Sequence, residues 1–352
     1  MRVLLVRLGA FGDIVHTLPL AADLHAAGHH VGWVCEDRWA ALLRDNPVID
    51  RLHLLPRGRW RRDASPLAQR RRDLRQLRRE LRNAGYQAAI DAQGLAKSAA
   101  LLLASAAPRR VGHQAGRARE LSWLATRHRS PALASHVIDQ QRALALALGT
   151  VARGGWRFPL PAWGEERARI NAWLTSHDLV RPWTLNVGAG WPTKVWPHAH
   201  QRAFASACTA AGTPLVLAWG SPSERATAEE VAADTGAILA PATSIGELGA
   251  LLAASAVVVS GDTGPLHLAL ALGTPTVGLF GPVPGSRNGP RGLSHRVLQA
   301  PGASWERRDV TRVDMGAISP AVVLEAAQSV ARHGAVTHCL PSRSAQHGRH
   351  VG

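Results

Sequence analysis

Two segments of the chain place an aspartate directly after a glycine that follows a short apolar run. The first segment, RLGAFGDIVHTLPL, contains Gly12 and Asp13, and the second, VVVSGDTGPLHLALALGTPTVGLFGP at residues 257–282, contains Asp262 and His267. In each segment the apolar run predicts a β-strand and the residues after it predict a helix. Open α/β sheets bind ligands at the carboxyl ends of such strands, so both aspartates are candidates for a functional site.

The aspartate of the first segment is a candidate general base. The first strand has its apolar run at residues 3–6 and is expected to end at Gly9. Gly12 permits a close backbone approach, and Asp13 opens the helix that follows. Amides exposed at a helix start would hold the Asp13 carboxylate ionised, and an ionised carboxylate can accept a proton from an attacking hydroxyl. An aspartate that only caps the helix fits this stretch equally well. The segment lacks the third glycine of the dinucleotide fingerprint, so it is not specific by itself.

The second segment is more informative because a strand, a turn, a helix and a next strand are all legible in it. Asp262 or Thr263 is expected to cap the helix, with Pro265 in its first turn. Backbone amides near Thr263 and Gly264, with the His267 imidazole one turn later, could then hold a diphosphate, and glycine at 264 would allow its close approach. A plain helix start and a histidine that only packs are the alternatives.

Short apolar runs alternate with helical patterns in two series, which is typical of parallel β-α-β units. A Gly- and Pro-rich stretch at 153–163 interrupts the alternation. We therefore predict two Rossmann-like domains, 1–155 and 156–334, and a polar, frayed tail at 335–352. The predicted strands lie at 3–6, 31–35, 51–55 and 88–91, and then at 184–188, 214–220, 256–262 and 274–281, with a final helix at 319–333.

Composition narrows the class of protein. A hydrophobic content of 46% excludes a wholly disordered chain, and no apolar run reaches the roughly 18 residues of a membrane-spanning helix. The N-terminal stretch lacks a small-residue cleavage site, so we interpret it as a strand and not as a signal peptide. Cys35, Cys208 and Cys339 have neither metal-ligand nor disulfide spacing, which suits a reducing compartment. We predict no metal and no cofactor, and interpret the histidines of the tail as solvated.

The formal net charge of +16 is unevenly distributed. Residues 57–82 contain eleven arginines against three acidic residues, and residues 67–83 carry leucines among arginines, which predicts a basic amphipathic helix. This surface favours an anionic partner, either a membrane or a phosphorylated ligand, although arginines on a solvated face are the alternative. A nucleic-acid-binding protein is a remote alternative, because RNA-binding modules stack bases on aromatic side chains and the chain has one Tyr and four Phe.

The second segment, with D-T-G-P-L-H-L-A-x-A-L-G-T-P-T-V-x-L-F-G-P, resembles the C-terminal signature of glycosyltransferase family 9, the bacterial lipopolysaccharide heptosyltransferases. G-D-x-x-H-T-L-P at 12–19 is similar to the N-terminal motif of that family, and IDAQGLAKSAAL at 90–101 resembles its type I enzymes, which add the first heptose. The resemblance covers nearly all of residues 1–330. It implies an α/β GT-B fold, an ADP-heptose donor, a Kdo-lipid A acceptor and metal-independent inversion at the anomeric carbon.

The resemblance also implies roles for residues at the donor. Asp13 matches the proposed catalytic base, and Lys194 in WPTKVWP matches a lysine near the diphosphate, where an ammonium would offset charge growing on the departing ADP. Glu224 matches a ribose-binding acid. A surface lysine and an ordinary first-turn glutamate are the alternatives for these two. The other positions matched to nucleotide and phosphates are Gly12, Asp262, Thr263, Gly264 and His267.

For the acceptor, the matching positions are basic, and the planar fork of arginine suits carboxylates and phosphates. These residues are Arg59, Arg61, Arg62, Lys97 and Arg119. Two features depart from the type I pattern: Gly58, where a basic residue is expected, and a Gly-rich stretch at 112–117. They leave the identity of the acceptor less defined. A GT-B enzyme with another sugar nucleotide or acceptor is therefore the alternative. Together with a lipid-linked acceptor, the basic helix predicts a cytoplasmic enzyme on the anionic inner-membrane surface.

Overall fold

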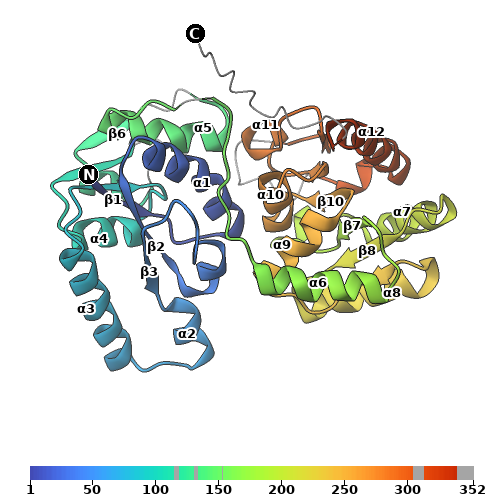
Figure 1. Cartoon of the computed structure of the whole chain (residues 1–352), viewed down its shortest axis with the longest axis horizontal. Coiled ribbons are helices and arrows are strands. Elements are labelled where there is room, and N and C mark those ends of the chain that lie inside the picture. Colours follow the sequence, from blue (N-terminus) through green and yellow to red (C-terminus); the bar gives the residue numbers. More distant parts are fainter. Residues whose placement is uncertain (115–118, 131–133, 153, 304–312, 339–352) are drawn as a thin grey trace, which may run out of the picture.

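The structure, a computed structural model of the chain, describes residues 1–114, 119–130, 134–152, 154–303 and 313–338, with side chains described to residue 333. It has two lobes, each built on a six-stranded parallel sheet with helices on both faces (Figure 1). This is the predicted GT-B arrangement of two doubly wound sheets.

The first lobe contains every strand that the apolar runs predicted in this half of the chain. Its strands are β1 (Arg2–Val6), β2 (His30–Glu36), β3 (Arg51–Leu55), β4 (Ala88–Asp91), β5 (Arg109–His113) and β6 (His128–Ser130). Its helices are α1 (Phe11–Ala26), α2 (Arg57–Arg62), α3 (Leu67–Asn83), α4 (Ala96–Ala104) and α5 (Val137–Arg142). The sequence pattern did not single out β5 and β6, because polar residues interrupt both strands.

The second lobe also contains its four predicted strands. The strands are β7 (Trp183–Asn186), β8 (Leu215–Ala218), β9 (Ile238–Leu239), β10 (Val257–Gly261), β11 (Thr276–Phe280) and β12 (His295–Gln299). The helices are α6 (Gly164–Ser176), α7 (His198–Ala210), α8 (Pro222–Thr235), α9 (Ile245–Ala254), α10 (Gly264–Ala271), α11 (Gly285–Asn288) and α12 (Pro320–His338). The green segment that leads into α6 joins the lobes (Figure 1).

The strand orders explain where a site can form. They are β3-β2-β1-β4-β5-β6 and β12-β11-β10-β7-β8-β9, and all strand pairs are parallel. The direction of winding therefore reverses between β1 and β4 in one sheet and between β7 and β10 in the other. The loops that leave neighbouring strands at such a point turn to opposite faces and open a crevice at the carboxyl edge.

Strand β1 shows why the sheet holds together. Its residues Val3 to Val6 are fully buried and alternate between two apolar clusters. Val3 and Leu5 pack towards α1, while Leu4 and Val6 pack towards Leu77 and Leu81 of α3. A parallel sheet is covered on both faces, which is why its strands read as continuous apolar runs.

The two lobes touch through α1 and α10. Ile14 and Leu18 of α1 belong to the same buried apolar cluster as Leu268 and Ala269 of α10. This contact places the start of α1 beside the start of α10, so the ends of β1 and β10 face each other across the lobes.

Two glycines lie at this contact between the lobes. A Cβ on Gly12 would lie 2.5 Å from Cδ2 of His267, and a Cβ on Gly264 would collide with the ring of Phe11. Each glycine therefore leaves space for a ring from the opposite lobe. The sequence predicts a close backbone approach at Gly12 and the close approach of a diphosphate at Gly264, and the second prediction stays open.

The C-terminal helix is longer than predicted. Helix α12 runs to His338 and packs on α7 and the second sheet, so residues 335–338, expected in the frayed tail, are helical. The rest of the predicted tail, including Cys339, lies outside the described residues. Within the described part of the chain, no helix combines the length and the apolar character needed to span a bilayer.

Candidate active site

A cavity of about 420 Å³ opens between the lobes, where the chain leaves β1, β7 and β10. Gly12 and Asp13 line it from the first lobe, and Lys194, Asp262 and His267 line it from the second. Three segments far apart in the sequence are thus brought to one place. The cavity's remaining lining residues are Ala10, Phe11, His16, Trp39, Val137, Gly190, Trp191, Thr263, Gly264, Val283, Arg287 and Asn288.

Asp13 is the third residue of α1, and the N-cap of this helix is Ala10. The prediction that Asp13 opens the helix is therefore wrong by two residues. Its Oδ2 lies 2.5 Å from Nη2 of Arg7 and accepts the N–H of Ala10 at 3.2 Å. These two contacts hold the Asp13 side chain in place, and it remains 42% exposed beside the cavity. An exposed carboxylate fixed in this way can take a proton from a bound hydroxyl.

Asp262 is the centre of a buried network. Its Oδ2 lies 2.5 Å from Nζ of Lys194, and its Oδ1 accepts from Nε2 of His267 at 3.2 Å and Nδ2 of Asn288 at 2.6 Å. Burial would raise the pKa of Asp262, but the hydrogen bond and charge of His267 and the ammonium of Lys194 together lower it well below the usual range. The carboxylate is occupied by three protein donors, which favours a role in orienting Lys194 and His267.

The alternative that Lys194 is an ordinary surface lysine is wrong. The residue ends the short 3-10 helix η4 (Pro192–Lys194), and its side chain is only 16% exposed. Besides the Asp262 carboxylate, its ammonium bonds the Asp262 carbonyl at 3.3 Å and lies 5.1 Å from the centre of the Trp191 ring. An ammonium has three N–H donors, and two are used here. The third donor is available to a molecule in the cavity.

The start of α10 supplies further donors. Thr263 is the N-cap residue and Pro265 lies in the first turn, as predicted, but no side chain caps the helix. The Thr263 hydroxyl pairs instead with the Ser260 hydroxyl at 3.1 Å. The positive end of the helix dipole is thus presented to the crevice, an arrangement that favours anions.

A second cavity of about 350 Å³ continues from the first. The two cavities share the lining residues Phe11, Gly190, Thr263 and Gly264. They form one groove with the start of α10 at its middle. Such a groove suits a molecule whose two parts are joined by an anionic link.

Glu224 lines this second cavity and also belongs to a helix start. It is the third residue of α8, whose N-cap is Ser221, and its Oε2 accepts the N–H of Gly220 at 2.7 Å. The predicted ligand role and the ordinary first-turn role are therefore compatible. Trp219, which sequence reasoning did not select, lines the same cavity.

The residues predicted for the acceptor lie elsewhere on the first lobe. None of Arg59, Arg61, Arg62, Lys97 and Arg119 lines the cavity between the lobes. Arg59 pairs with Asp73 at 2.7 Å, Arg62 pairs with Asp63 at 3.4 Å, and the Arg119 N–H bonds the Gly94 carbonyl. Part of the Gly-rich stretch at 112–117 lies outside the described residues.

Lys97 belongs to a cluster of cations around one buried carboxylate. The side chain of Glu36, at the carboxyl end of β2, is 3% exposed. Its carboxylate forms ion pairs with Lys97 at 3.5 Å, Arg57 at 3.1 Å and Arg38 at 3.0 Å. One carboxylate therefore pairs with three cationic side chains. The cluster has a surplus of positive charge at the same edge of the sheet as Asp13.

Sequence reasoning missed several lining residues of the cavity. Asn288 follows the recognised segment in SRNG, and no local pattern marks it as a partner of Asp262. Trp191 stands in the same WPTK stretch as Lys194, so the motif that identified Lys194 could also have identified Trp191. His16 is in the N-terminal motif but was not selected.

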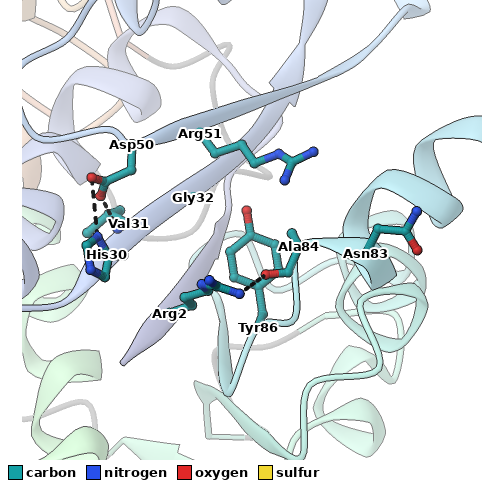
Figure 2. Close-up of a pocket in the computed structure, with 9 residues that line it drawn as sticks. All are labelled: Arg2, His30, Val31, Gly32, Asp50, Arg51, Asn83, Ala84 and Tyr86. Carbon is teal, nitrogen blue, oxygen red and sulfur yellow. Dashed lines mark hydrogen bonds and ion pairs between the residues drawn. The ribbon is translucent and has the colours of Figure 1, made fainter.

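A separate cavity of about 410 Å³ opens at the opposite, amino-terminal edge of the first sheet (Figure 2). Some of its polar groups are bonded to one another: the Asp50 carboxylate accepts the Val31 N–H at 2.6 Å, and Arg2 donates to the Ala84 carbonyl. No residue predicted for the site lies there. Among the described residues, no group of three His, Cys, Asp or Glu side chains is placed to hold a metal.

Comparison with known proteins agrees with this geometry. A model of glycosyltransferase family 9 (heptosyltransferase) matches residues 74–314. The chain belongs to glycosyltransferase family 9. Its relatives in this family include lipopolysaccharide heptosyltransferase 1 of Pseudomonas aeruginosa, 33% identical over 80% of this chain and 79% of the relative. Lipopolysaccharide heptosyltransferase 1 of Escherichia coli K12 is 30% identical over 86% and 94%.

Solved structures of a heptosyltransferase have the same fold. E. coli heptosyltransferase WaaC with ADP is 27% identical, with a TM-score of 0.77 over 94% of this chain and all of that one. WaaC with ADP-2-deoxy-2-fluoro heptose gives a TM-score of 0.74 at the same identity, over 92% of this chain and 98% of that one. The family 9 assignment thus rests on sequence and fold together.

Proposed function

We propose that this family 9 glycosyltransferase transfers heptose from ADP-heptose to Kdo-lipid A, the first step in building the lipopolysaccharide inner core. The observation that carries the proposal is the groove that Asp13, Lys194 and the start of α10 line together. The names of the relatives, lipopolysaccharide heptosyltransferase 1, support heptose as the sugar and lipopolysaccharide as the class of acceptor.

The groove suggests how the donor lies. The nucleoside occupies the cavity lined by Trp219 and Glu224, with the Glu224 carboxylate towards the ribose. The sugar occupies the cavity lined by Asp13 and His267. The diphosphate then lies at the residues common to both cavities, Thr263 and Gly264, where the helix start and Lys194 stabilise its charge.

The proposed reaction is a single displacement. The acceptor hydroxyl oxygen bonds to the anomeric carbon while the bond from that carbon to the diphosphate oxygen breaks, and Asp13 takes the hydroxyl proton. Attack from the face opposite the leaving group inverts the anomeric configuration. ADP leaves with its growing charge stabilised by Lys194 and the amides of α10, so no metal is required by this scheme.

The basic residues outside the cavity are proposed to hold the acceptor. Arg59, Arg61 and Arg62 lie on α2, and Lys97 lies at the start of α4. Together with Arg119 they offer donors to the carboxylates and phosphates of Kdo-lipid A. Closure of the lobes would then bring the acceptor hydroxyl to Asp13.

A donor competition assay tests this function. Purified protein is mixed with Kdo-lipid A and equal amounts of ADP-heptose, ADP-glucose and UDP-glucose, and the products are identified by mass. We expect heptose-bearing lipid A as the main product. Transfer of glucose in preference to heptose would instead support the alternative GT-B enzyme with another donor, and release of free sugar alone would contradict the acceptor.

We also propose that α3 binds the anionic cytoplasmic face of the inner membrane. Four exposed residues of this helix, Leu67, Arg71, Leu74 and Arg78, form one stripe, spaced three or four residues apart. Leu67 is 68% exposed and Leu74 is 43% exposed, and both lie among the arginines of this helix. Exposed apolar side chains between cations are typical of a helix that lies in a membrane interface.

Removal of charge from α3 is expected to weaken membrane binding. The triple variant Arg71→Gln, Arg75→Gln, Arg78→Gln should bind vesicles of anionic phospholipid about a hundredfold less tightly at low salt, since each arginine contributes about 1 kcal/mol at such a surface. Vesicle flotation measures the effect. The matched control changes three exposed arginines of the second lobe, Arg167, Arg181 and Arg202, and should float like the wild type. Equal losses in both triple variants would mean that total charge, and not α3, drives binding.

A further inference from the structure

His16 is a buried histidine of the cavity to which the scheme above gives no role. It lies three residues after Asp13 on α1, on the same side of the helix, and lines the cavity between the lobes. Only 3% of its surface is exposed, and within the described structure neither ring nitrogen has a hydrogen-bond partner. Buried polar groups nearly always have partners, so two unpartnered nitrogens in one ring call for a physical reason.

The surroundings of His16 keep it uncharged. Burial lowers the pKa of His16 well below its usual value, and the nearby His267, His136 and Arg7 lower it further, while Asp262 opposes them. The His267 ring lies edge-on at 4.1 Å between ring centres. A neutral imidazole has one N–H donor and one acceptor nitrogen, and both are unsatisfied here.

One donor and one acceptor in the same ring match a hydroxyl group, which also donates one hydrogen bond and accepts another. A diphosphate only accepts and would favour a charged ring, whereas a sugar hydroxyl can satisfy a neutral one. Because His16 lines the part of the groove beside Asp13, the group that meets it is the sugar and not the nucleoside. We propose that His16 is a specificity-determining residue that hydrogen-bonds a hydroxyl of the donor's sugar, an inference that rests on the proposed glycosyl transfer.

The proposal is tested by comparing two ligands that differ only in the sugar. Calorimetry without acceptor gives the dissociation constants of ADP and of ADP-heptose for the wild type and for His16→Leu, which removes both nitrogens. We expect ADP binding within about twofold of the wild type and ADP-heptose binding about tenfold weaker, the effect of leaving one sugar hydroxyl unpaired. His16→Asn or His16→Gln should recover part of this loss, because an amide also donates and accepts.

Several controls make the outcome specific. His25→Leu changes an exposed histidine of the same helix outside the cavity and should leave both constants unchanged. His16→Leu replaces unsatisfied polar atoms with an apolar group, so its melting temperature should not fall. If it does fall, the ratio of the two constants in His16→Asn and His16→Gln still decides the question.

The possible failures are distinguishable. Equal affinity of His16→Leu and wild type for ADP-heptose, or an equal loss for both ligands, would overturn the sugar contact. Failure of the wild type to bind ADP-heptose at all would contradict the proposed donor instead.

Discussion

Replacing Asp13 with asparagine lowers kcat about a thousandfold and leaves the dissociation constant of ADP within about twofold of the wild type. The amide keeps an oxygen that can accept the Ala10 N–H, so the start of α1 should remain intact. It cannot take the proton of the acceptor hydroxyl. Steady-state transfer assays at saturating donor and acceptor, with calorimetry for ADP, measure the two effects.

The matched control for this variant is Glu247→Gln. Glu247 is also the third residue of a helix, accepts the N–H of its N-cap residue Ser244 at 2.8 Å and pairs with Arg169 at 2.8 Å. It does not line either cavity of the groove. Its variant should keep wild-type turnover. If Asp13→Asn does the same, Asp13 only stabilises the helix and is not the base.

Replacing Lys194 with methionine lowers kcat by about two to three orders of magnitude. The loss arises because the ammonium would stabilise the charge that grows on ADP as the glycosidic bond breaks. Lys97 and Lys194 are the chain's two lysines, so Lys97→Met is a natural comparison. We expect it to raise the KM for Kdo-lipid A and to leave donor binding unchanged, as judged from transfer kinetics with each substrate varied in turn.

A double variant separates catalysis from stability at this position. Lys194→Met deprives the buried Asp262 carboxylate of its counter-charge, which should lower the free energy of unfolding. Adding Asp262→Asn removes that uncompensated charge and should restore part of the stability in a denaturant titration. Turnover should not return with it. Recovery of turnover together with stability would mean that Lys194 is structural.

The fold was largely predictable because its signals are local. Strand β3 begins and ends at the residues predicted from RLHLL, and α3 matches the predicted amphipathic stretch of 67–83. Strands β9 and β12 lacked such a signal, since β9 has two residues and β12, HRVLQ, has only two apolar residues between polar ones at the edge of its sheet. Long buried runs are legible in a sequence, whereas short edge strands depend on their neighbours.

The site was predictable only in part. Asp13, Lys194 and His267 were identified by their motifs, and the structure places all three in one cavity. The hydrogen bond from Asn288 to Asp262 joins residues 26 positions apart, and the contact of His16 with His267 joins opposite lobes. No spacing rule reports such contacts, because they depend on how the lobes pack.

Two glycines at the contact between the lobes also show that contacts between distant residues could not be predicted from the sequence. Gly12 and Gly264 were correctly singled out as places of close approach, but the sequence could not tell what approaches. The rings of His267 and Phe11 occupy those spaces. Contacts between lobes therefore shape the crevice as much as the strand ends do.

The most direct measurement is a crystal structure of the protein with ADP-heptose bound. We expect the diphosphate within hydrogen-bond distance of Lys194 and the first amides of α10, the nucleoside beside Glu224 and the anomeric carbon facing Asp13. A donor bound away from this groove, for instance in the cavity at the amino-terminal edge of the first sheet, would contradict the assignment of the site and the mechanism built on it.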